Sequence, residues 1–263
     1  MAQDVYTHGH HESVLRSHRW RTAENSAAYL LADLAPGTSV LDVGCGPGTI
    51  TRDFAARVSP GRVTGVDNAA AVVAGASAEA PANAEFRVAD VYALPFPDGS
   101  FDVVHAHQVL QHLTDPVAAL REMRRVCRPG GIVAARDADY AAMTWYPRSP
   151  ALADWLDLYE RVARSNGAEP DAGRHLLAWA REAGFADVAC SATAWCFATG
   201  PEREWWGGLW ADRVRESGFA DQALARELAT EAELDRMAAA WREWARSEAA
   251  WFAVLNGEIR CRR

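Results

Sequence analysis

Residues 40–49 read VLDVGCGPGT, and this short stretch decides the fold. A short apolar strand is predicted at 39–43, and it runs directly into Gly44, Gly46 and Gly48. Glycines placed just after a buried strand let the backbone turn sharply and approach a ligand without a Cβ in the way. The stretch therefore predicts a strand, a ligand-binding turn and then a helix over 49–58.

Strands and helices are predicted to alternate on both sides of this turn. Apolar residues over 12–34 recur at helical spacing and predict one amphipathic helix, with Arg16, Arg19 and Arg21 on its solvated side. Asp115-Pro116 is a good helix start, because Asp caps free amides and Pro accepts the first-turn geometry. Further strands are predicted at 62–66, 85–89, 101–106 and 132–136. This alternation indicates a parallel sheet with right-handed crossovers.

Beyond residue 140 the pattern becomes mainly helical. Ten of the 11 tryptophans lie from Trp145 onward, so the two halves of the chain are expected to do different jobs. Two strand-like stretches, 186–198 and 252–261, are expected to close the sheet as an antiparallel pair. Helices are predicted at 150–164, 173–183, 201–216, 219–228 and 231–250.

These elements predict an α/β fold: a doubly wound, Rossmann-like sheet of seven mostly parallel strands, with an antiparallel last strand and a Trp-rich helical cover. We expect residues 1–38 to form an N-terminal helical cap and 39–140 the ligand-binding core. Residues 141–263 would supply the rest of the sheet and a helical substrate-binding insertion. That insertion is expected at about 141–170 and 200–250.

Composition narrows the classes of partner. A formal charge of −8 argues against nucleic acid, which needs a concentrated basic face. No apolar run approaches the ~20 residues that span a bilayer, and the first residues lack a secretory pattern, so we expect a cytoplasmic protein without a membrane partner. Five cysteines without CxxC spacing predict buried free thiols and no metal site. A small-molecule substrate is expected, and a homodimer is compatible with the sequence.

Two acidic residues define the ligand further. Asp67 ends the second predicted strand, where a carboxylate can accept hydrogen bonds from both hydroxyls of a ribose. Asp90 ends the third predicted strand, where a second carboxylate can accept a hydrogen bond from the amino group of an adenine. Two carboxylates so close to a pyrophosphate would repel it. A phosphate-free ligand that carries a sulfonium cation suits them better.

In these residues the chain resembles the class I S-adenosylmethionine-dependent methyltransferases. Within that class it resembles specifically the group around the ubiquinone/menaquinone C-methyltransferases. The likeness covers residues 39–137 and includes ALPFPDGSFD at 93–102, VLQHL at 109–113, LREM at 120–123 and RPGG at 128–131.

The resemblance implies S-adenosylmethionine as cofactor and assigns its contacts. Gly44, Gly46 and Gly48 would line the methionine and ribose moiety. Asp67 would bind the ribose, and Asp90 with the Val91 amide would read the adenine. Three further residues are donor-binding candidates. Asp42 would orient the loop or the donor's ammonium, and His107 would lie close to the methyl group. Asn68 is the third, at a position where the family often has a hydrophobic or small residue.

Catalytic candidates on the acceptor side come from two places. Tyr6 and His10 lie in a His-rich segment that in related enzymes folds over the donor, and the alternative is that this segment is a solvated tail. His107 follows the fourth strand, whereas His112 is expected only to pack.

Aromatic residues are the candidates for acceptor binding. Most of the tryptophans are expected to be core. Trp205-Trp206 precede Gly207-Gly208, which suggests a flexible hinge presenting flat apolar surfaces to a ligand. We therefore take Tyr146, Trp205 and Trp206 as substrate-binding candidates.

The sequence thus predicts a methyltransferase of the secondary-metabolite type, acting at carbon, oxygen or nitrogen of a small apolar or aromatic metabolite such as an indole, phenol or quinol. A quinone-biosynthesis C-methyltransferase is the alternative that the resemblance alone suggests. A noncatalytic regulatory protein that binds S-adenosylmethionine is the alternative from another class. A nicotinamide dehydrogenase is disfavoured, because the loop lacks the spacing of the third glycine.

Overall fold

Strand β1 (Val40–Val43) lies at the centre of a twisted sheet and is buried along its whole length. In this computed structural model, which describes residues 6, 7, 9 and 12–263, the sheet has eight strands. Their order is β3-β2-β1-β4-β5-β8-β6, with β7 on the outer edge of β8. The parallel strands are β2 (Val63–Asp67), β3 (Ala84–Val88), β4 (Phe101–His107) and β5 (Cys127–Ala138).

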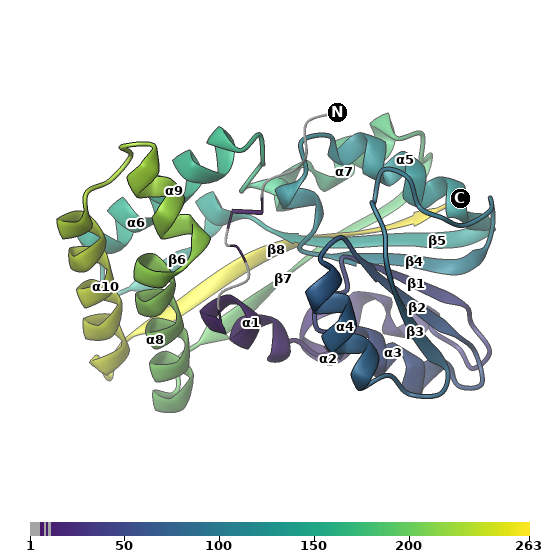
Figure 1. Ribbon diagram of the computed structural model, residues 1–263, viewed down its shortest axis with the longest axis horizontal. Coiled ribbons are helices and arrows are strands. Elements are labelled where there is room, and N and C mark those ends of the chain that lie inside the picture. Colours follow the sequence, from purple (N-terminus) through teal and green to yellow (C-terminus); the bar gives the residue numbers. More distant parts are fainter. Residues whose placement is uncertain (1–5, 8, 10–11) are drawn as a thin grey trace.

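Helices α3 (Thr49–Val58), α4 (Ala70–Ala78) and α5 (Pro116–Val126) connect the parallel strands and cover the sheet (Figure 1). The start of α5 is as predicted, because Asp115 accepts a hydrogen bond from the Ala118 amide and Pro116 occupies the first turn. Helix α7 (Ala172–Glu182) packs closely on the sheet. A Cβ at Gly257 of β8 would lie 2.1 Å from the Gly173 carbonyl oxygen, so only glycine fits there.

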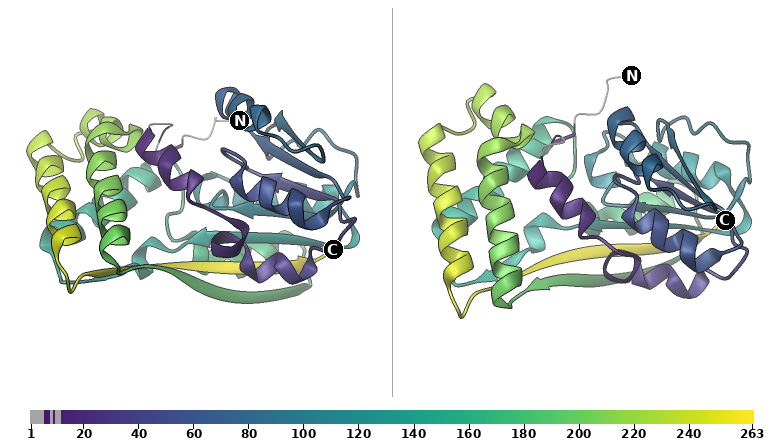
Figure 2. Two further views of the ribbon diagram at one scale, coloured as in Figure 1. Left: turned by 90° about the horizontal axis from the view of Figure 1, so that it is seen from below. Right: turned by 60° about the horizontal axis from the view of Figure 1, so that its bottom comes forward.

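Strand β8 (Trp251–Arg262) joins the two halves of the molecule. Its residues 256–262 pair antiparallel with β5, and its residues 251–253 pair with the short strand β6 (Thr144–Tyr146). Strand β7 (Asp187–Phe197) pairs with β8 along its whole length. Figure 2 shows this two-stranded ribbon running from the core to the helices of the cover. The antiparallel closing pair is confirmed, whereas β6 was not predicted and makes the sheet eight-stranded.

The cover consists of α6 (Pro150–Ser165), α8 (Gly200–Glu216), α9 (Gly218–Ala225) and α10 (Glu231–Arg246). Its centre is aromatic, as expected for most of the tryptophans. Trp155 is fully buried, with its ring centroid 4.5 Å from that of Trp210 and 4.8 Å from that of Trp241. The Phe252 side chain of β8 contacts the same cluster, so this end of β8 packs into the hydrophobic core of the cover.

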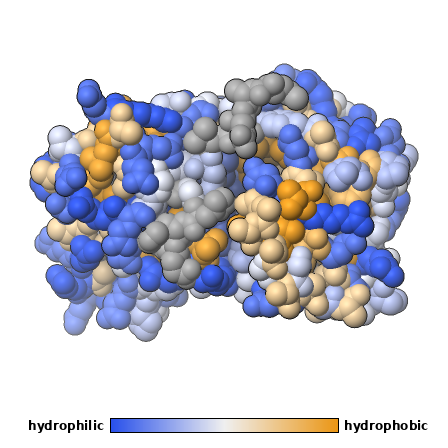
Figure 3. Space-filling view, in the orientation of Figure 1, coloured by the Kyte–Doolittle hydropathy of each residue, from blue (hydrophilic) through white to orange (hydrophobic). Residues whose placement is uncertain are grey.

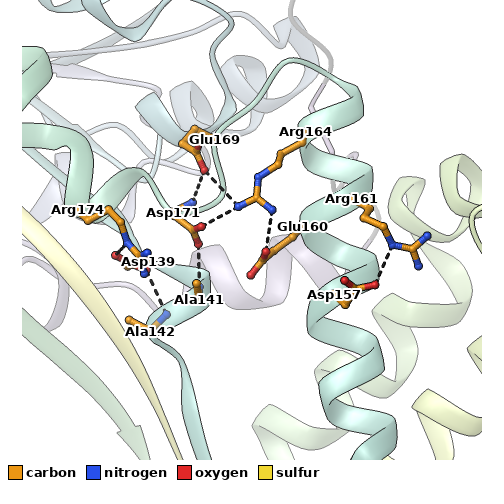
Figure 4. A network of polar contacts seen from close by, with 10 residues as sticks. All are labelled: Asp139, Ala141, Ala142, Asp157, Glu160, Arg161, Arg164, Glu169, Asp171 and Arg174. Carbon is orange, nitrogen blue, oxygen red and sulfur yellow. Dashed lines mark hydrogen bonds and ion pairs between the residues drawn. The ribbon is translucent and has the colours of Figure 1, made fainter.

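A network of charged residues attaches α6 to the core (Figure 4). Arg164 of α6 forms an ion pair with Asp171 at the start of α7 (2.7 Å). Asp171 also accepts a hydrogen bond from the Ala141 amide, and Arg174 of α7 holds Asp139 at 2.7 Å. These contacts fix the short 3₁₀ turn η3 (Tyr140–Ala142), which follows β5 at its carboxyl end.

The N-terminal part differs from the single helix predicted over 12–34. It forms α1 (Glu12–Arg19), α2 (Ala23–Ser26) and the 3₁₀ helix η1 (Ala28–Asp33). Thr22 starts the second helix, because its hydroxyl and the Asn25 side chain make a reciprocal capping box. The break turns Trp20 toward the cover, where its ring packs against Trp195 at 5.3 Å. Helix α1 lies between the cover and the core (Figure 2), with Arg16 paired to Asp212 of α8.

One smaller expectation also changes. All five cysteines are free, but Cys190 and Cys196 are exposed because they lie on the edge strand β7. Among the described residues no helix is long and apolar enough to cross a membrane.

The predicted hinge at Gly207-Gly208 is wrong, because both glycines lie within helix α8. A Cβ at Gly207 would lie 2.8 Å from the Ala245 Cβ and 2.8 Å from the Trp241 carbonyl oxygen of α10. This glycine therefore permits close approach of two helices. Gly208, in contrast, has no atom within 4 Å of the position where its Cβ would lie.

The two adjacent glycines provide a matched test of this packing. Gly207→Ala should destabilise the fold by about 1–3 kcal/mol, because the added methyl group overpacks the contact between α8 and α10. Gly208→Ala should stabilise it by about 0.5–1 kcal/mol, because alanine is the better helix former. Urea unfolding of both variants measures the difference. Equal effects of the two substitutions would contradict the close contact.

Candidate active site

A cavity of about 700 Å³ lies at the carboxyl ends of β1, β2 and β4 and extends beneath the cover. The turn after β1 and the segments after β2 and β3 form one end of it. Helix α1, the turn η3, strand β7 and helix α8 line the other end. Helix α4 contributes to the rim through Val72, and its small apolar residues form a patch right of centre in Figure 3.

The glycine turn has a backbone that only glycine adopts easily. Gly44, Gly46 and Gly48 have φ angles of 65°, 53° and 77°, in the left-handed region. A Cβ at Gly44 would lie 2.3 Å from Val109 Cγ2. The Gly46 amide donates a hydrogen bond to Asp67 Oδ2 at 3.0 Å, which holds the turn against the end of β2.

Asp42 is buried beneath this turn. One of its carboxylate oxygens accepts a hydrogen bond from Thr51 Oγ1 (2.5 Å), and the other contacts His105 Nδ1 (2.8 Å). Both oxygens are therefore engaged in holding β1, α3 and β4 together. Of the two roles considered for Asp42, this arrangement favours orientation of the loop.

The remaining donor-binding candidates line the same end of the cavity, namely Asp67, Asn68, Asp90 and Val91. Asp67 Oδ1 accepts a hydrogen bond from the Ala69 amide at 3.0 Å, so this carboxylate organises the start of α4 as well as the glycine turn. Asp90 accepts one from the Tyr92 amide at 2.9 Å and is exposed. The carboxyl ends of adjacent parallel strands bring these residues together, as the sequence predicts.

Four of the acceptor-side candidates line the other part of the cavity: Tyr6, His107, Trp205 and Trp206. His10 lies outside the described residues. Tyr146 does not line the cavity, because it occupies the outward-facing position of β6 and is 55% exposed. Its neighbour Trp145 points inward instead and stacks on Phe252, with ring centroids 5.6 Å apart.

The N-terminal segment is docked at Tyr6 and Thr7, so these two residues do not form a solvated tail. Thr7 is fully buried, and its carbonyl oxygen accepts a hydrogen bond from Gln222 of α9. The Tyr6 hydroxyl lies 3.2 Å from His18 Nε2, and its ring meets His112 edge-on at 4.7 Å. Burial raises the pKa of Tyr6 to about 12, so its hydroxyl stays protonated at neutral pH.

His107 is buried against Trp195, with ring centroids 5.6 Å apart. Within the described part of the chain, neither ring nitrogen has a hydrogen-bond partner. Burial, and after it the positive charge of Arg21, lowers the pKa of His107 well below its usual value. A proton taken up here would sit beside guanidinium groups. The ring is therefore suited to accept or donate a hydrogen bond as a neutral group, and poorly suited to hold a proton as a general base.

Several cavity residues were missed by sequence reasoning. Arg21 lines the cavity and does not belong to a solvated helix face, because the chain breaks after α1. His112 also lines the cavity, which corrects its expected role in packing. The Thr22–Asn25 capping pair is the signal that could have revealed the break. The other missed residues are His18, Gln108, Gln111, Tyr140 and Arg213.

Comparisons with known proteins agree with this geometry. Residues 41–135 match the family model of a methyltransferase domain. An uncharacterized methyltransferase of Schizosaccharomyces pombe is 36% identical over 98% of this chain and 96% of its own length. The chain belongs to the class I S-adenosylmethionine-dependent methyltransferases.

Two further matches show how far the likeness extends. A ubiquinone/menaquinone biosynthesis C-methyltransferase of Hahella chejuensis is 45% identical to this methyltransferase, but over only 36% of this chain and 41% of its own. The solved structure of the YcgJ protein of Bacillus subtilis superposes with a TM-score of 0.58 at 18% identity, covering 91% of this chain and 99% of that one. The second match shows a shared fold.

The buried histidines predict how the stability of this methyltransferase depends on pH. Burial lowers the pKa of His112 to about 3, below the value of about 6.5 in an unfolded chain. Below pH 6.5 the unfolded chain binds a proton that the native state does not, so this group lowers stability by about 1.4 kcal/mol per pH unit. His112→Gln should therefore lose less stability than the wild type between pH 7.5 and 5. Thermal unfolding measures this, and parallel curves would refute the neutral, buried state of His112.

Proposed function

We propose that this methyltransferase transfers a methyl group from S-adenosylmethionine to a small apolar or aromatic metabolite bound under the tryptophan-rich cover. The observation that carries the proposal is one continuous cavity with two unlike ends. Acidic residues and a glycine turn form one end, and Trp195, Trp205, Trp206 and Trp210 line the other.

The residues at the first end fit the donor. S-adenosylmethionine supplies an activated methyl group on a positively charged sulfur. The glycine turn offers backbone without side chains, so a ligand can approach it closely. In this proposal Asp67 holds the ribose hydroxyls, with Asn68 beside it, and Asp90 with the Val91 amide holds the adenine. Asp42 keeps the turn in place from below.

The residues at the second end position the acceptor. Transfer from an activated donor depends mainly on alignment and exclusion of water. Trp206 is buried and stacks on Phe197 at 4.3 Å, so its ring offers a fixed flat surface. Tyr6 and His107 both line the cavity, and as protonated phenol and neutral imidazole they can orient the reacting atom by hydrogen bonds. A flat aromatic acceptor fits this lining.

The division of labour along the chain follows from this arrangement. We assign residues 39–140 to donor binding, residues 1–38 to a cap and residues 141–263 to the rest of the sheet and the substrate-binding insertion. Separate hydrophobic clusters support it, since the aromatic cluster of the cover takes its buried members from residues 138–254.

The quinone-biosynthesis alternative rests on relatives that match only part of this chain. The match to the Hahella chejuensis protein spans about a third of this chain. It therefore bears on the donor and not on the acceptor under the cover. Metabolites of the secondary-metabolite type, including indoles and phenols, fit the aromatic lining as well as a quinol does.

Donor binding can be tested without knowing the acceptor. S-adenosylhomocysteine at micromolar concentration should raise the melting temperature, because a ligand that binds only the native state stabilises it, whereas NAD should not. Asp67→Ala should weaken this binding at least tenfold, since it removes charged hydrogen bonds of about 1.5–3 kcal/mol each. Calorimetric titration measures the loss.

The outcomes separate the competing classes. Stabilisation by NAD alone would overturn the donor assignment. Unchanged affinity of Asp67→Ala would mean that this carboxylate only supports the turn. Donor binding without formation of S-adenosylhomocysteine from labelled donor, across a broad panel of aromatic metabolites, would favour the noncatalytic alternative.

The role of Tyr6 has its own test. Tyr6→Phe should reduce methyl transfer to the panel at least tenfold and leave the affinity for S-adenosylhomocysteine nearly unchanged, because a positioning hydrogen bond acts mainly in the transition state. Tyr146→Phe is the matched control, since this tyrosine is exposed and outside the cavity. Full turnover by Tyr6→Phe would show that the Tyr6 hydroxyl has no role in the reaction.

A further inference from the structure

We propose that the acceptor binds as an anion: a flat apolar molecule whose carboxylate or ionised phenol is held by Arg21 and Arg213. This inference rests on the proposed function and names the substrate class for the same cavity. It concerns two arginines that the methyl-transfer chemistry itself does not require.

Arg21 lies between α1 and α2 and reaches into the cavity. Its Nη2 donates a hydrogen bond to Gln108 Oε1 at 2.5 Å, and its guanidinium lies 5.8 Å from the centre of the Trp195 ring. Its Nε is buried without a hydrogen-bond partner among the described residues, and none of their carboxylates forms an ion pair with it. Burial lowers the pKa of Arg21 to about 10, so it remains charged at neutral pH.

A second guanidinium lines the same cavity from the cover. Arg213 of α8 is only 4% exposed, donates a hydrogen bond to Ser17 Oγ at 2.9 Å and lies 4.6 Å from the centre of the Trp210 ring. The positive charge of Arg213 lowers the pKa of Arg21, which shows that the two guanidinium groups interact. Two like charges brought together inside a protein cost free energy, which an anion between them would recover.

A third buried arginine provides a comparison, because it has a carboxylate partner within the fold. Arg136 of β5 is 1% exposed and pairs with Glu258 of β8 at 3.2 Å. Arg21 has only the neutral Gln108 amide in the corresponding role. An arginine that merely supported the fold would be expected to have a carboxylate partner, as Arg136 does.

The charges of the cavity are also separated in space. Its acidic lining residues are Asp42, Asp67 and Asp90, and all three follow or belong to strands at the donor end. Arg21 and Arg213 belong to the N-terminal segment and the cover. The buried Asp137, which Arg21 influences electrostatically, does not line the cavity, and burial raises its pKa to about 7. The acceptor end is therefore positive where the donor end is negative.

The lining next to these arginines defines the rest of the ligand. Met143, Val254 and the stacked Trp206 are apolar, and the Tyr140 ring lies beside them in the cavity wall. A guanidinium binds planar oxyanions through paired hydrogen bonds. A flat aromatic acid or acidic phenol matches both features. An ionised phenol would itself need no general base, because its oxygen has already lost the proton.

The test compares acids with neutral molecules of the same shape. Binding of 2-naphthoate and of 2-naphthamide to the full-length protein saturated with S-adenosylhomocysteine is measured by calorimetry. A second pair, 4-nitrophenolate and its methyl ether, distinguishes a phenolate from a carboxylate site. We expect at least one acid to bind tenfold or more tightly than its neutral partner. Equal affinity within both pairs would overturn the proposal.

Variants then locate the effect. Arg21→Gln and Arg213→Gln should each abolish most of the preference for the acid, and Arg21→Lys should retain part of it because the charge remains. Arg16→Gln is the matched control, since Arg16 lies on α1 but pairs with Asp212 outside the cavity. A preference for the acid that survives both glutamine variants would also refute the assignment. The comparison in the wild-type protein stands even where a variant does not fold.

A separate titration keeps the two proposals apart. Arg21→Gln should bind S-adenosylhomocysteine as tightly as the wild type does, since donor binding is assigned to other residues. If S-adenosylhomocysteine does not bind even the wild type, the proposed function fails. The acid and the amide are then compared without it, and their relative affinity still decides the anion site.

Discussion

The pairing of β7 with β8 is the interaction on which the rest of the molecule depends. Its ladder runs without interruption from Asp187 and Arg262 at the core to Phe197 and Phe252 beneath the cover. Because β8 also pairs with β5, the aromatic half is attached to the parallel sheet by backbone hydrogen bonds and not by a loop. Trp195 and Phe197 are therefore held at fixed positions relative to the glycine turn. The ion pairs around Asp171 brace the same junction from the side of α6.

On this frame the protein builds an electrostatic gradient across one cavity. The strand ends place carboxylates where a cationic donor fits, and the cover and N-terminal segment bring guanidinium groups to the opposite side. The buried imidazoles between them stay neutral because burial and the neighbouring arginines disfavour a further positive charge. Such a gradient requires the cap and cover as much as the core. The donor half alone would lack the two arginines of the positive end.

Much of the donor half could be read from the sequence, because its signals are local. A buried strand that runs into Gly44, or that ends at Asp67, predicts both the strand and a ligand-binding residue at its carboxyl end. The acceptor half depends on contacts between distant residues. Helical periodicity continues across Thr22 and hides the break that turns Arg21 inward. A three-residue strand does not reveal which face Trp145 takes until its partner Phe252 is known. Gly207 resembles a hinge until α10 is seen against it.

The position of β8 in the sheet also has a consequence for how the chain acquires its structure during synthesis. This strand is the last of the described elements along the sequence, yet it lies between β5 and β7. While residues 251–262 are still to be made, the long edges of β5 and β7 have no partner, and the aromatic helices already synthesised have no sheet to pack on. A nascent chain thus carries exposed apolar surface and open strand edges until residues 251–262 have emerged. Contacts of such high sequence separation form late and slowly.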